Sequence, residues 1–270
     1  MIYERQPGIP KFECTTFHKK QSDYALLIPV INEGERILAE LTRAHDAHVM
    51  DVVDVILCDG GSTDDSLVPE KLRILGVNTL LIKQDEGRQG AQLRMGFWWA
   101  LERGYHGIVT IDGNNKDSIE DVPKFVEKLK EGFDFIQGSR FVKGGKAIHT
   151  PLVRLLSVRL IHAPVISLTA RHFFTDTTNA YRAYSERYLK HPQVQPLRDI
   201  FVTYELLAYL SVRASQLGMH VCEIPVTRAY PPKGKTPTKI SPISGNLNLL
   251  KILFKNLCGA YKPRPKELEP

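Results

Sequence analysis

Cysteine is scarce in this 270-residue sequence, and its placement argues against two kinds of small, cross-linked domain. The four cysteines lie far apart and without paired spacing, at Cys14, Cys58, Cys222 and Cys258. Zinc sites and disulfide frameworks place cysteines in pairs at short, recurring spacings. We therefore expect neither kind of site, and we expect a reducing compartment such as the cytoplasm.

Long hydrophobic runs are also missing. No charge-free apolar stretch reaches the roughly 18 to 20 residues that are needed to span a bilayer. Residues 1–22 are polar and mixed in charge, which is not typical of a signal peptide. With 43% hydrophobic residues, the chain can nevertheless build a sizeable core. We therefore expect a protein that is soluble or peripheral on the cytoplasmic face of a membrane.

Acidic residues are absent from one stretch and rare in another. Residues 135–175 contain six Lys or Arg and no Asp or Glu, and residues 228–270 contain nine Lys or Arg and two Glu. Such segregation of charge indicates an anionic partner, which could be a phosphorylated substrate, a membrane surface or a nucleic acid. Neither stretch contains a nucleic-acid recognition motif, so we expect no nucleic-acid partner.

The chain does contain an alternation of short apolar runs and helical patterns. Apolar, β-branched runs predict buried strands at 24–30, 52–58, 79–83, 107–111 and 133–138. Helical spacing of apolar residues predicts helices at 35–48, at 91–103 and in several later segments. This order is typical of right-handed βαβ units. We therefore predict an α/β fold, with a doubly wound and mostly parallel sheet flanked by helices.

Composition divides the chain into three parts. We expect a loosely held N-terminal extension at 1–23, one globular domain at 24–230, and a basic loop with an amphipathic helix at 231–270. Pro164 is expected to kink or end a helix that spans 152–168. The last helix has an apolar face with lysines interposed and following it, so we predict peripheral attachment to an anionic membrane surface through 243–266.

Polar side chains follow two of the predicted strands. Asp59 ends the second strand, and Asp112 begins a polar stretch directly after the fourth. Ligands bind at the carboxyl ends of strands in open α/β sheets, so these two positions predict a binding site. Ser62 and Ser118 each stand three residues before an Asp. This spacing is that of a capping box, so a helix is expected to begin after each serine.

Five segments together resemble family 2 glycosyltransferases. The subgroup that they resemble includes dolichyl-phosphate mannosyltransferase and bacterial polyprenyl-phosphate glycosyltransferases. The segments are Pro29-Val-Ile-Asn32-Glu33, Asp59-Gly-Gly-Ser62-Thr-Asp64, Asp112-Gly-Asn114, Gly138-Ser-Arg140-Phe-Val-Lys-Gly-Gly and Asp176-Thr-Thr-Asn-Ala-Tyr-Arg182. The similarity runs from about residue 24 to residue 255, which is most of the chain. It implies a GT-A fold, a Rossmann-like sheet that binds a nucleotide sugar, with a C-terminal helical appendage.

The resemblance also implies roles for individual residues at the donor end of the site. The residues implied to bind the nucleotide sugar are Pro29, Asn32, Glu33, Asp59, Ser62, Arg88, Asp112, Gly113 and Lys239. Asp112 and Asn114 are implied to hold Mg²⁺ or Mn²⁺, which would neutralise the diphosphate of the donor.

The sequence departs from the family pattern at three positions. Gly60 stands where the family usually has a second Asp in the first acidic turn. The family's Asp-x-Asp motif ends here in Asn114, and Lys116 stands where the subgroup often has Gln. A neutral amide and a cation are both weaker partners for a metal ion than the residues that they replace. Both substitutions therefore bear on whether a metal binds.

The resemblance implies an enzyme that transfers a sugar, with inversion, from a nucleotide sugar to a polyprenyl phosphate, as in the biosynthesis of cell-surface polysaccharides. Arg140 and Arg154 would orient the phosphate of such an acceptor. A soluble glycan acceptor remains open, and Asp176 would then act as the general base for its hydroxyl group. A non-catalytic module that binds sugar nucleotides or membranes also remains open. The sequence does not decide between a monomer and a homo-oligomer.

Overall fold

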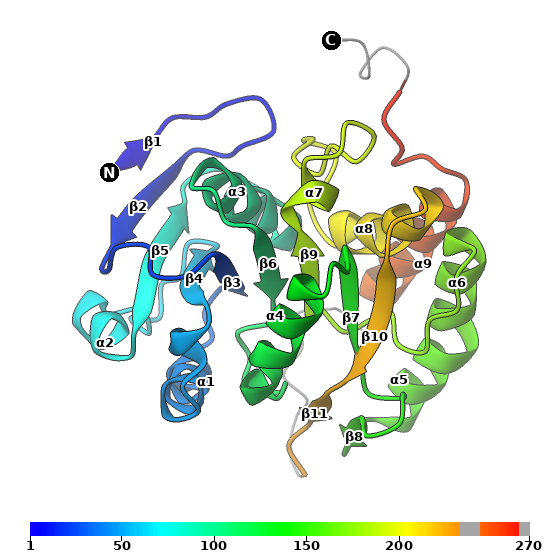
Figure 1. Cartoon of the computed structure of the whole chain (residues 1–270), viewed down its shortest axis with the longest axis horizontal. Coiled ribbons are helices and arrows are strands. Elements are labelled where there is room, and N and C mark those ends of the chain that lie inside the picture. Colours follow the sequence, from blue (N-terminus) through cyan, green and yellow to red (C-terminus); the bar gives the residue numbers. More distant parts are fainter. Residues whose placement is uncertain (233–243, 265–270) are drawn as a thin grey trace.

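The computed structural model describes residues 1–232 and 244–264, and a single mixed sheet runs through the middle of this part (Figure 1). Its strands are β1 (Ile2–Tyr3), β2 (Phe12–Thr16), β3 (Tyr24–Val30), β4 (Asp54–Asp59), β5 (Val77–Lys83), β6 (Gly107–Thr110), β7 (Phe135–Ser139), β9 (Arg182–Ser185) and β10 (Val221–Pro225). The strand order is β1-β2-β5-β4-β3-β6-β9-β7-β10. Two short strands, β8 (Lys146–Ile148) and β11 (Thr227–Ala229), pair in parallel beside this sheet.

The centre of the sheet is parallel, as the sequence predicts. β5, β4, β3 and β6 run side by side in the same direction, so their carboxyl ends meet at one edge. The sequence does not predict β9, which lies between β6 and β7 and runs antiparallel to both. β9 has only four residues, and its arginine and serine interrupt any apolar run. The predicted α/β class is confirmed, and the sheet is mixed on the side that carries β9.

Helices cover both faces of the sheet. They are α1 (Glu35–Asp46), α2 (Pro69–Ile74), α3 (Gln89–Glu102), α4 (Val122–Lys130), α5 (Leu152–Ser157), α6 (Ala163–Ala170), α7 (Glu186–Leu189), α8 (Glu205–Gln216) and α9 (Ser244–Leu257). Short η1 (Val49–Asp51) and η2 (Ile119–Asp121) are 3₁₀ turns, and η3 (Val158–His162) is a π-helical segment.

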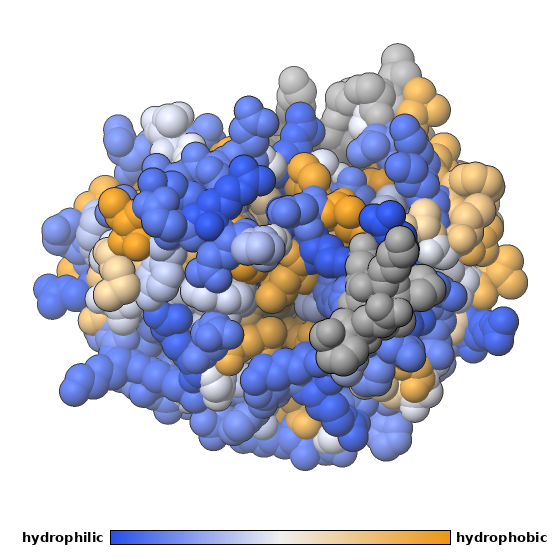
Figure 2. Space-filling view, turned by 90° about the horizontal axis from the view of Figure 1, so that it is seen from above, coloured by the Kyte–Doolittle hydropathy of each residue, from blue (hydrophilic) through white to orange (hydrophobic). Residues whose placement is uncertain are grey.

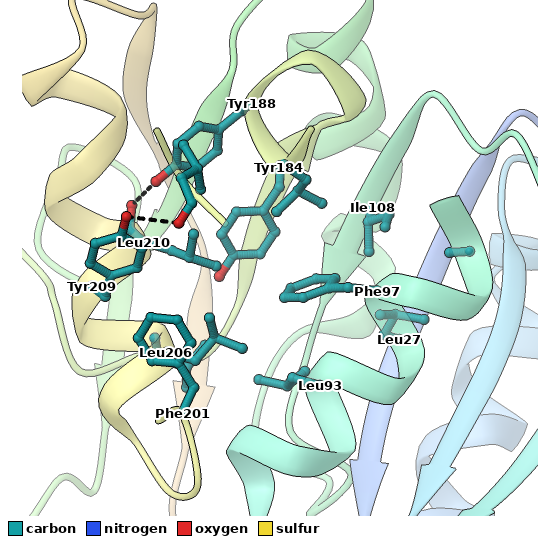
Figure 3. Packing of buried hydrophobic residues seen from close by; sticks show 14 of the residues in the cluster. Leu27, Leu93, Phe97, Ile108, Tyr184, Tyr188, Phe201, Leu206, Tyr209 and Leu210 are labelled. Atoms are coloured by element: carbon teal, nitrogen blue, oxygen red, sulfur yellow. Dashed lines mark hydrogen bonds between the residues drawn. The ribbon is translucent and has the colours of Figure 1, made fainter. Parts of the chain in front are cut away.

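Each face has its own hydrophobic core, because successive residues of a strand point to opposite sides. Leu27 of β3 belongs to the core that also contains residues of α3, α6, α8 and α9, whereas its neighbours Leu26 and Ile28 belong to the core that contains residues of α1, α2 and α4. Figure 3 shows the first core, where Phe97 of α3 lies between the sheet and the aromatic residues near α8. Both cores lie behind the carboxyl edge of the sheet and support it.

The expectation of a loosely held N-terminal extension is wrong. β2 pairs antiparallel with β5 over five residue pairs, and β1 pairs with β2. The side chain of Phe12 is fully buried and stacks on Tyr3, with 4.7 Å between the ring centroids. Residues 1–23 thus extend the sheet by two strands, and the boundaries of the three predicted parts stay a prediction.

Neither predicted capping box caps a helix. The helix expected after Ser62 begins later, because α2 starts at Pro69, and Ser62 donates its N–H and its hydroxyl to Asp59 instead. Ser118 precedes the 3₁₀ turn η2, and its hydroxyl donates to the carboxylate of Asp121 without accepting a helical N–H. Both serines fix the turns that follow strands β4 and β6.

The segment from Leu152 to Ala170 forms one continuous 19-residue helix through α5, η3 and α6. In a regular α-helix the ring of Pro164 would meet the carbonyl group of Leu160, and Leu160 lies in the π-helical segment η3. The predicted interruption is therefore a local change of helix type. By length and composition this is the one helix in the described ranges that could cross a membrane, and 22% of it is buried.

Candidate active site

A cleft of about 860 Å³ opens at the carboxyl edge of the parallel strands. One wall follows β3, β4 and β6, and the other comes from α5, η3, α6, α8 and α9. The cleft thus lies between the predicted donor-binding half and the less regular second half of the chain. The predicted site residues that line it are Pro29, Glu33, Arg88, Asp112, Gly113, Asn114, Arg140 and Arg154.

Three predicted donor-binding residues do not line the cleft but hold the turns beside it. The carboxylate of Asp59 accepts the N–H of Ser62 at 2.9 Å and its hydroxyl at 2.6 Å. Asn32 donates its N–H to the Ser62 hydroxyl at 2.9 Å and accepts the N–H of Thr63 at 2.7 Å. Asn32, Asp59 and Ser62 therefore hold the turns after β3 and β4 in contact, with Gly60 of the second turn facing the cleft.

Gln92 and Gln89, which the sequence analysis did not identify, also position this wall. The amide of Gln92 donates to the carbonyls of Val30 and Cys58, at 2.7 Å each, and so joins the ends of β3 and β4. One turn earlier on α3, Gln89 donates to Asp112 at 3.0 Å. Both lie on a helix with an apolar pattern, so a polar residue there is hard to recognise from sequence alone.

Asp112 lies in the cleft directly after β6, as predicted, and its carboxylate is held by a residue from the far end of the chain. Arg228 of β11 donates to Asp112 at 3.2 Å and also to the buried carboxylate of Asp117. Burial on its own would raise the pKa of Asp112, but Arg228 and Lys116 hold it below the ordinary value. Asp112 therefore carries its negative charge over the whole physiological pH range.

Arg228 was counted in the sequence only as the first basic residue of the tail. Its place is fixed by backbone pairing, because Lys116 accepts the N–H of Ala229 at 2.8 Å and Ser118 donates to Thr227 at 2.9 Å. Burial lowers the pKa of Arg228, but the carboxylates of Asp117 and Asp112 more than reverse this and raise it. The guanidinium therefore stays charged although its side chain is only 8% exposed.

Asp112 and Asn114 fit the predicted Mg²⁺ or Mn²⁺ poorly. A hard divalent cation takes about six oxygen ligands. Both oxygens of Asp112 already accept hydrogen bonds, and Arg228 and Lys116 place positive charge beside it. The side-chain oxygen of Asn114 is buried without a hydrogen-bond partner, so it offers one neutral ligand. Among residues 1–232 and 244–264, no cluster of three or more His, Cys, Asp or Glu side chains could hold a metal ion.

Arg140 and Asp176 form a buried ion pair at the floor of the cleft. Arg140 Nε donates to Asp176 Oδ2 at 2.6 Å, and Nη2 donates to Oδ1 at 2.9 Å. Arg140 lines the cleft, whereas Asp176 is fully buried behind it. A base must reach the proton that it removes. In this structure Asp176 holds Arg140 and does not itself line the cleft, and the general-base role that the resemblance implies for it stays a prediction.

Arg154 of α5 lines the opposite part of the cleft and contacts Tyr230, which follows β11. Arg154 donates to the Tyr230 hydroxyl at 3.0 Å. Burial raises the pKa of Tyr230, but the guanidinium groups of Arg228 and Arg154 lower it below its ordinary value. Arg88, just before α3, also lines the cleft. Lys239, the remaining predicted donor contact, lies outside the described residues.

The cleft carries a large excess of positive charge. Among the described residues that line it, seven are Arg or Lys and two, Glu33 and Asp112, are acidic. Glu33 is itself paired with Arg36 at 2.7 Å. Low-dielectric walls lined by one sign of charge attract ligands of the opposite sign. The cleft is therefore suited to substrates that carry several negative charges.

Known proteins are similar to this chain in sequence and in fold. The chain is 30% identical over 205 residues to undecaprenyl-phosphate mannosyltransferase of Micrococcus luteus, covering 74% of this chain and 81% of the relative. It is 26% identical over 263 residues to polyprenol monophosphomannose synthase of Mycolicibacterium smegmatis, covering 93% and 91%. Glucosyl-3-phosphoglycerate synthase from Mycobacterium tuberculosis, solved with Mn²⁺, uridine diphosphate and phosphoglyceric acid, matches the fold with a TM-score of 0.61.

That structural match has 15% sequence identity and covers 90% of this chain and 80% of the other, so it supports the fold alone. It confirms the predicted GT-A fold. The sequence model described as "Glycosyl transferase family 2" matches residues 25–191, which include β3 to β9 and most of the cleft wall on the donor side. The chain belongs to glycosyl transferase family 2 and is a glycosyltransferase.

Proposed function

We propose that this glycosyltransferase moves a sugar, with inversion, from a nucleotide sugar to a polyprenyl phosphate at the cytoplasmic face of a membrane. The observation that carries the proposal is the position of the cleft. Its positively charged walls continue directly into an exposed apolar surface, so an acceptor with a charged head and a lipid tail fits both. The names of the relatives in Micrococcus and Mycolicibacterium support the same acceptor class.

The donor fits the wall formed by the parallel strands. Pro29, Glu33 and Gly60 line the part of the cleft where a nucleoside would lie, and Asp59 holds the turn behind it. Gly113 lets the chain pass close to β3, because a side chain there would meet Val30 at 2.5 Å. The diphosphate would then lie beside Asp112 and Arg228, next to the positively charged centre of the cleft.

Arg140 and Arg154 fit the phosphate of the acceptor. Asp176 fixes Arg140 on the floor of the cleft. Arg154 lines the cleft from α5, the helix next to the apolar surface. Charge-assisted hydrogen bonds from two guanidinium groups would hold a phosphate monoester in one orientation. The uncharged residue Thr178 also lines the cleft, and its hydroxyl accepts a hydrogen bond from Arg140 at 3.0 Å.

The chemistry then needs orientation and charge stabilisation more than proton transfer. A phosphate monoester has its second pKa near about 6, so it is largely a dianion at neutral pH. An oxygen lone pair of the acceptor phosphate attacks the anomeric carbon and forms the new C–O bond. The bond from that carbon to the β-phosphate oxygen breaks, and its electron pair leaves with the nucleoside diphosphate. No proton is removed, which agrees with the buried position of Asp176 behind the cleft wall.

The apolar surface comprises the exposed side chains of the α5–η3–α6 helix and of α9. Its larger members are Leu152, Val153, Leu156, Leu160, Leu168, Leu247, Leu250 and Phe254. Figure 2 shows hydrophobic residues gathered along the right-hand edge of the molecule, the side on which α6 and α9 lie in Figure 1. Val153 also lines the cleft, so the apolar surface and the cleft are continuous.

This surface suits a helix pair that lies in the membrane interface. α6 packs on α8 and α9 with its inner side, so the outer side alone is available to lipid. Exposed cations, including Arg159, Arg171, Lys251 and Lys255, accompany the apolar side chains. Apolar side chains flanked by basic residues are typical of helices that bind anionic membrane surfaces. The predicted attachment through 243–266 thus extends to α5 and α6.

Mg²⁺ or Mn²⁺ enters no step of this proposal. If a divalent ion does bind, Asp112 and Asn114 are the residues that would hold it, and it would supply positive charge to the diphosphate. The hydrogen bonds of Asp112 and the two cations beside it speak against that binding.

Transfer of a labelled sugar tests the proposal. UDP-, GDP- and dTDP-sugars are first screened for thermal stabilisation of the protein, because a ligand that binds the folded state raises its stability. The best donor is then incubated with undecaprenyl phosphate, with undecaprenol and with free hexoses. Label should enter the lipid phase only with undecaprenyl phosphate. Label on a free hexose, with none on the lipid, would instead support the soluble acceptor.

A further inference from the structure

Two basic side chains, Lys116 and Arg228, line the cleft and lie close to the carboxylate of Asp112. We infer that Lys116 and Arg228 neutralise the diphosphate of the donor in this chain, in the place where the family resemblance implies a divalent cation, and that donor binding requires no metal. This inference rests on the proposed function for the identity of the donor.

The residues at the family's metal motif have the wrong charge for a divalent cation. Asn114 replaces an acidic residue by a neutral one, and Lys116 adds a positive charge two positions later. Asp112 is the one remaining acid of the motif, and its two oxygens accept hydrogen bonds from Gln89 and Arg228. A metal ion would have to displace Arg228 from Asp112 and then remain beside two cations.

Arg228 is held rigidly in this position. Its guanidinium contacts Asp112, Asp117 and Asn179, and the side chain is nearly buried. The antiparallel bridge between Asp117 and Arg228 joins the loop after β6 to β11. A charged group that is already fixed before the reaction stabilises a developing charge without the cost of reorganisation. Arg228 thus has the fixed geometry that a bound metal otherwise provides.

The cations around Tyr230 indicate that an anion completes the site. Three positively charged groups lie within 6 Å of its ring centroid: Lys116 Nζ at 5.3 Å, Arg154 Cζ at 5.6 Å and Arg228 Cζ at 5.8 Å. Like charges held this close repel one another, and Asp112 and Asp117 are the carboxylates that interact with Lys116 and Arg228. A diphosphate would balance this cluster, whereas a divalent cation would add to the repulsion.

The two side chains would act as the bond to the leaving group breaks. Negative charge then builds on the β-phosphate oxygen that departs from the anomeric carbon. The ammonium of Lys116 and the guanidinium of Arg228 would donate charge-assisted hydrogen bonds to the phosphate oxygens, and these bonds strengthen as the charge grows. Lys116 lines the cleft beside Asp112, so it can reach a diphosphate there.

Calorimetric titration with nucleoside diphosphates tests the inference without the acceptor. ADP, GDP, UDP and dTDP are each titrated in excess EDTA and again in Mn²⁺. We expect the tightest nucleotide to bind in EDTA with a Kd within about twofold of its value in Mn²⁺. Binding that requires Mn²⁺, or no binding of any of the four in EDTA, would overturn the inference.

Two variants and one control test whether Lys116 is responsible for nucleotide binding without a metal. Lys116→Gln should weaken nucleotide binding in EDTA at least tenfold, whereas Lys124→Gln on α4, a lysine that pairs with Asp121 at the surface, should leave it unchanged. Adding Asn114→Asp to Lys116→Gln restores the acidic motif, and the double variant should gain Mn²⁺ binding in electron paramagnetic resonance. Wild-type protein that binds Mn²⁺ as tightly as the double variant, or unchanged affinity of folded Lys116→Gln, would contradict the assignment.

The two proposals can fail separately. Metal-independent nucleotide binding without any transfer to undecaprenyl phosphate would sustain the role of Lys116 and Arg228 and reject the acceptor. Transfer to undecaprenyl phosphate that is lost in EDTA and restored by Mn²⁺ would sustain the acceptor and reject the role of Lys116 and Arg228.

Discussion

The Arg140–Asp176 pair shows how a single buried residue can control a site that it does not touch. Asp176 accepts two side-chain hydrogen bonds and the backbone N–H of Arg140, and its own N–H donates to Glu223 at 3.1 Å. Arg140 is only 3% exposed. The orientation of its guanidinium in the cleft is therefore set by its hydrogen bonds to Asp176. The carboxylate therefore acts through the guanidinium, and its loss would affect both stability and acceptor binding.

We predict that Asp176→Asn lowers the free energy of unfolding by about 3 kcal/mol, because it leaves the charge of Arg140 buried without its counter-ion. Urea denaturation at neutral pH measures this change. Transfer activity should fall as well, since Arg140 loses its position, and the pH dependence of the remaining activity should keep its shape. A variant of unchanged stability whose pH profile has lost its acidic limb would support the general-base role, because a general base loses activity when it is protonated at low pH.

Arg154 offers a matched comparison with Arg159 on the same helix. Arg154 lines the cleft, whereas Arg159 is exposed and lies over the ring of Phe141 at 5.4 Å. Removing a charge-assisted hydrogen bond costs about 1.5 to 3 kcal/mol. In detergent, Arg154→Ala should therefore reduce kcat/KM for undecaprenyl phosphate about tenfold to a hundredfold, and Arg159→Ala should change it less than twofold. Equal effects of the two substitutions would remove Arg154 from the acceptor site.

At the scale of elements, one carboxylate joins three strands on the side of the sheet that carries β9, the strand that the sequence did not predict. Asp134 precedes β7 and accepts hydrogen bonds from Arg187 at 2.6 Å, from Ser185 of β9 at 2.8 Å and from the N–H of His220 before β10 at 3.1 Å. Burial raises the pKa of Asp134, but Arg187, Ser185 and His220 together lower it below the ordinary value.

The lowered pKa gives this junction a defined pH dependence. An Asp whose folded-state pKa lies below the unfolded value of about 3.9 stabilises the fold above that pH, and the stabilisation is lost as pH falls through the folded value. Asp134→Asn should therefore cost about 2 kcal/mol at pH 7 and progressively less below pH 4. Urea denaturation of both proteins across this range tests it. Asp23→Asn, which breaks an exposed pair with Lys20, serves as the control and should cost under about 0.5 kcal/mol at any pH.

The elements that the sequence predicts well are those whose burial is visible locally. β3, β4, β5 and β6 are apolar runs, and an Asp lies at the carboxyl end of two of them, Asp59 as the last residue of β4 and Asp112 two residues after β6. The alternation of strands and helices was enough for the fold class. The polar strand β9 and the second strand from the edge, β2, were missed, because pairing with a distant neighbour rather than local composition makes them strands.

The site was predicted in part, because only some of its residues belong to local sequence patterns. Motifs placed Asp112 and Arg140 in the cleft, because each follows a buried strand directly. Arg228 contacts Asp112 across 116 positions of sequence, and Gln92 joins two strand ends from a helix. Such contacts depend on how the chain returns to the sheet, and no local pattern reports them. Asp176 illustrates the converse, because its motif was found but its side chain is buried against Arg140 and does not line the cleft.

At the scale of the whole molecule, the cleft and the apolar surface make one continuous face. Burying an exposed apolar side chain in a membrane contributes about 1.5 to 3 kcal/mol. Leu160→Asp on the α5–η3–α6 helix and Phe254→Asp on α9 should each weaken binding to anionic vesicles at least tenfold in a co-sedimentation assay. Ile74→Asp is the matched control, because Ile74 is 74% exposed on α2, at the far end of the sheet (Figure 1). Unchanged binding of Leu160→Asp and Phe254→Asp would show that lipid contacts another surface.

In the proposed reaction an oxygen of a lipid phosphate, rather than a hydroxyl group, receives the sugar. Phosphorus nuclear magnetic resonance of the lipid product tests this linkage directly. We predict that the phosphate monoester signal of undecaprenyl phosphate is converted to a phosphodiester signal coupled to the anomeric proton, with the anomeric configuration opposite to that of the donor. Consumption of the nucleotide sugar while the lipid phosphate remains a monoester would contradict it.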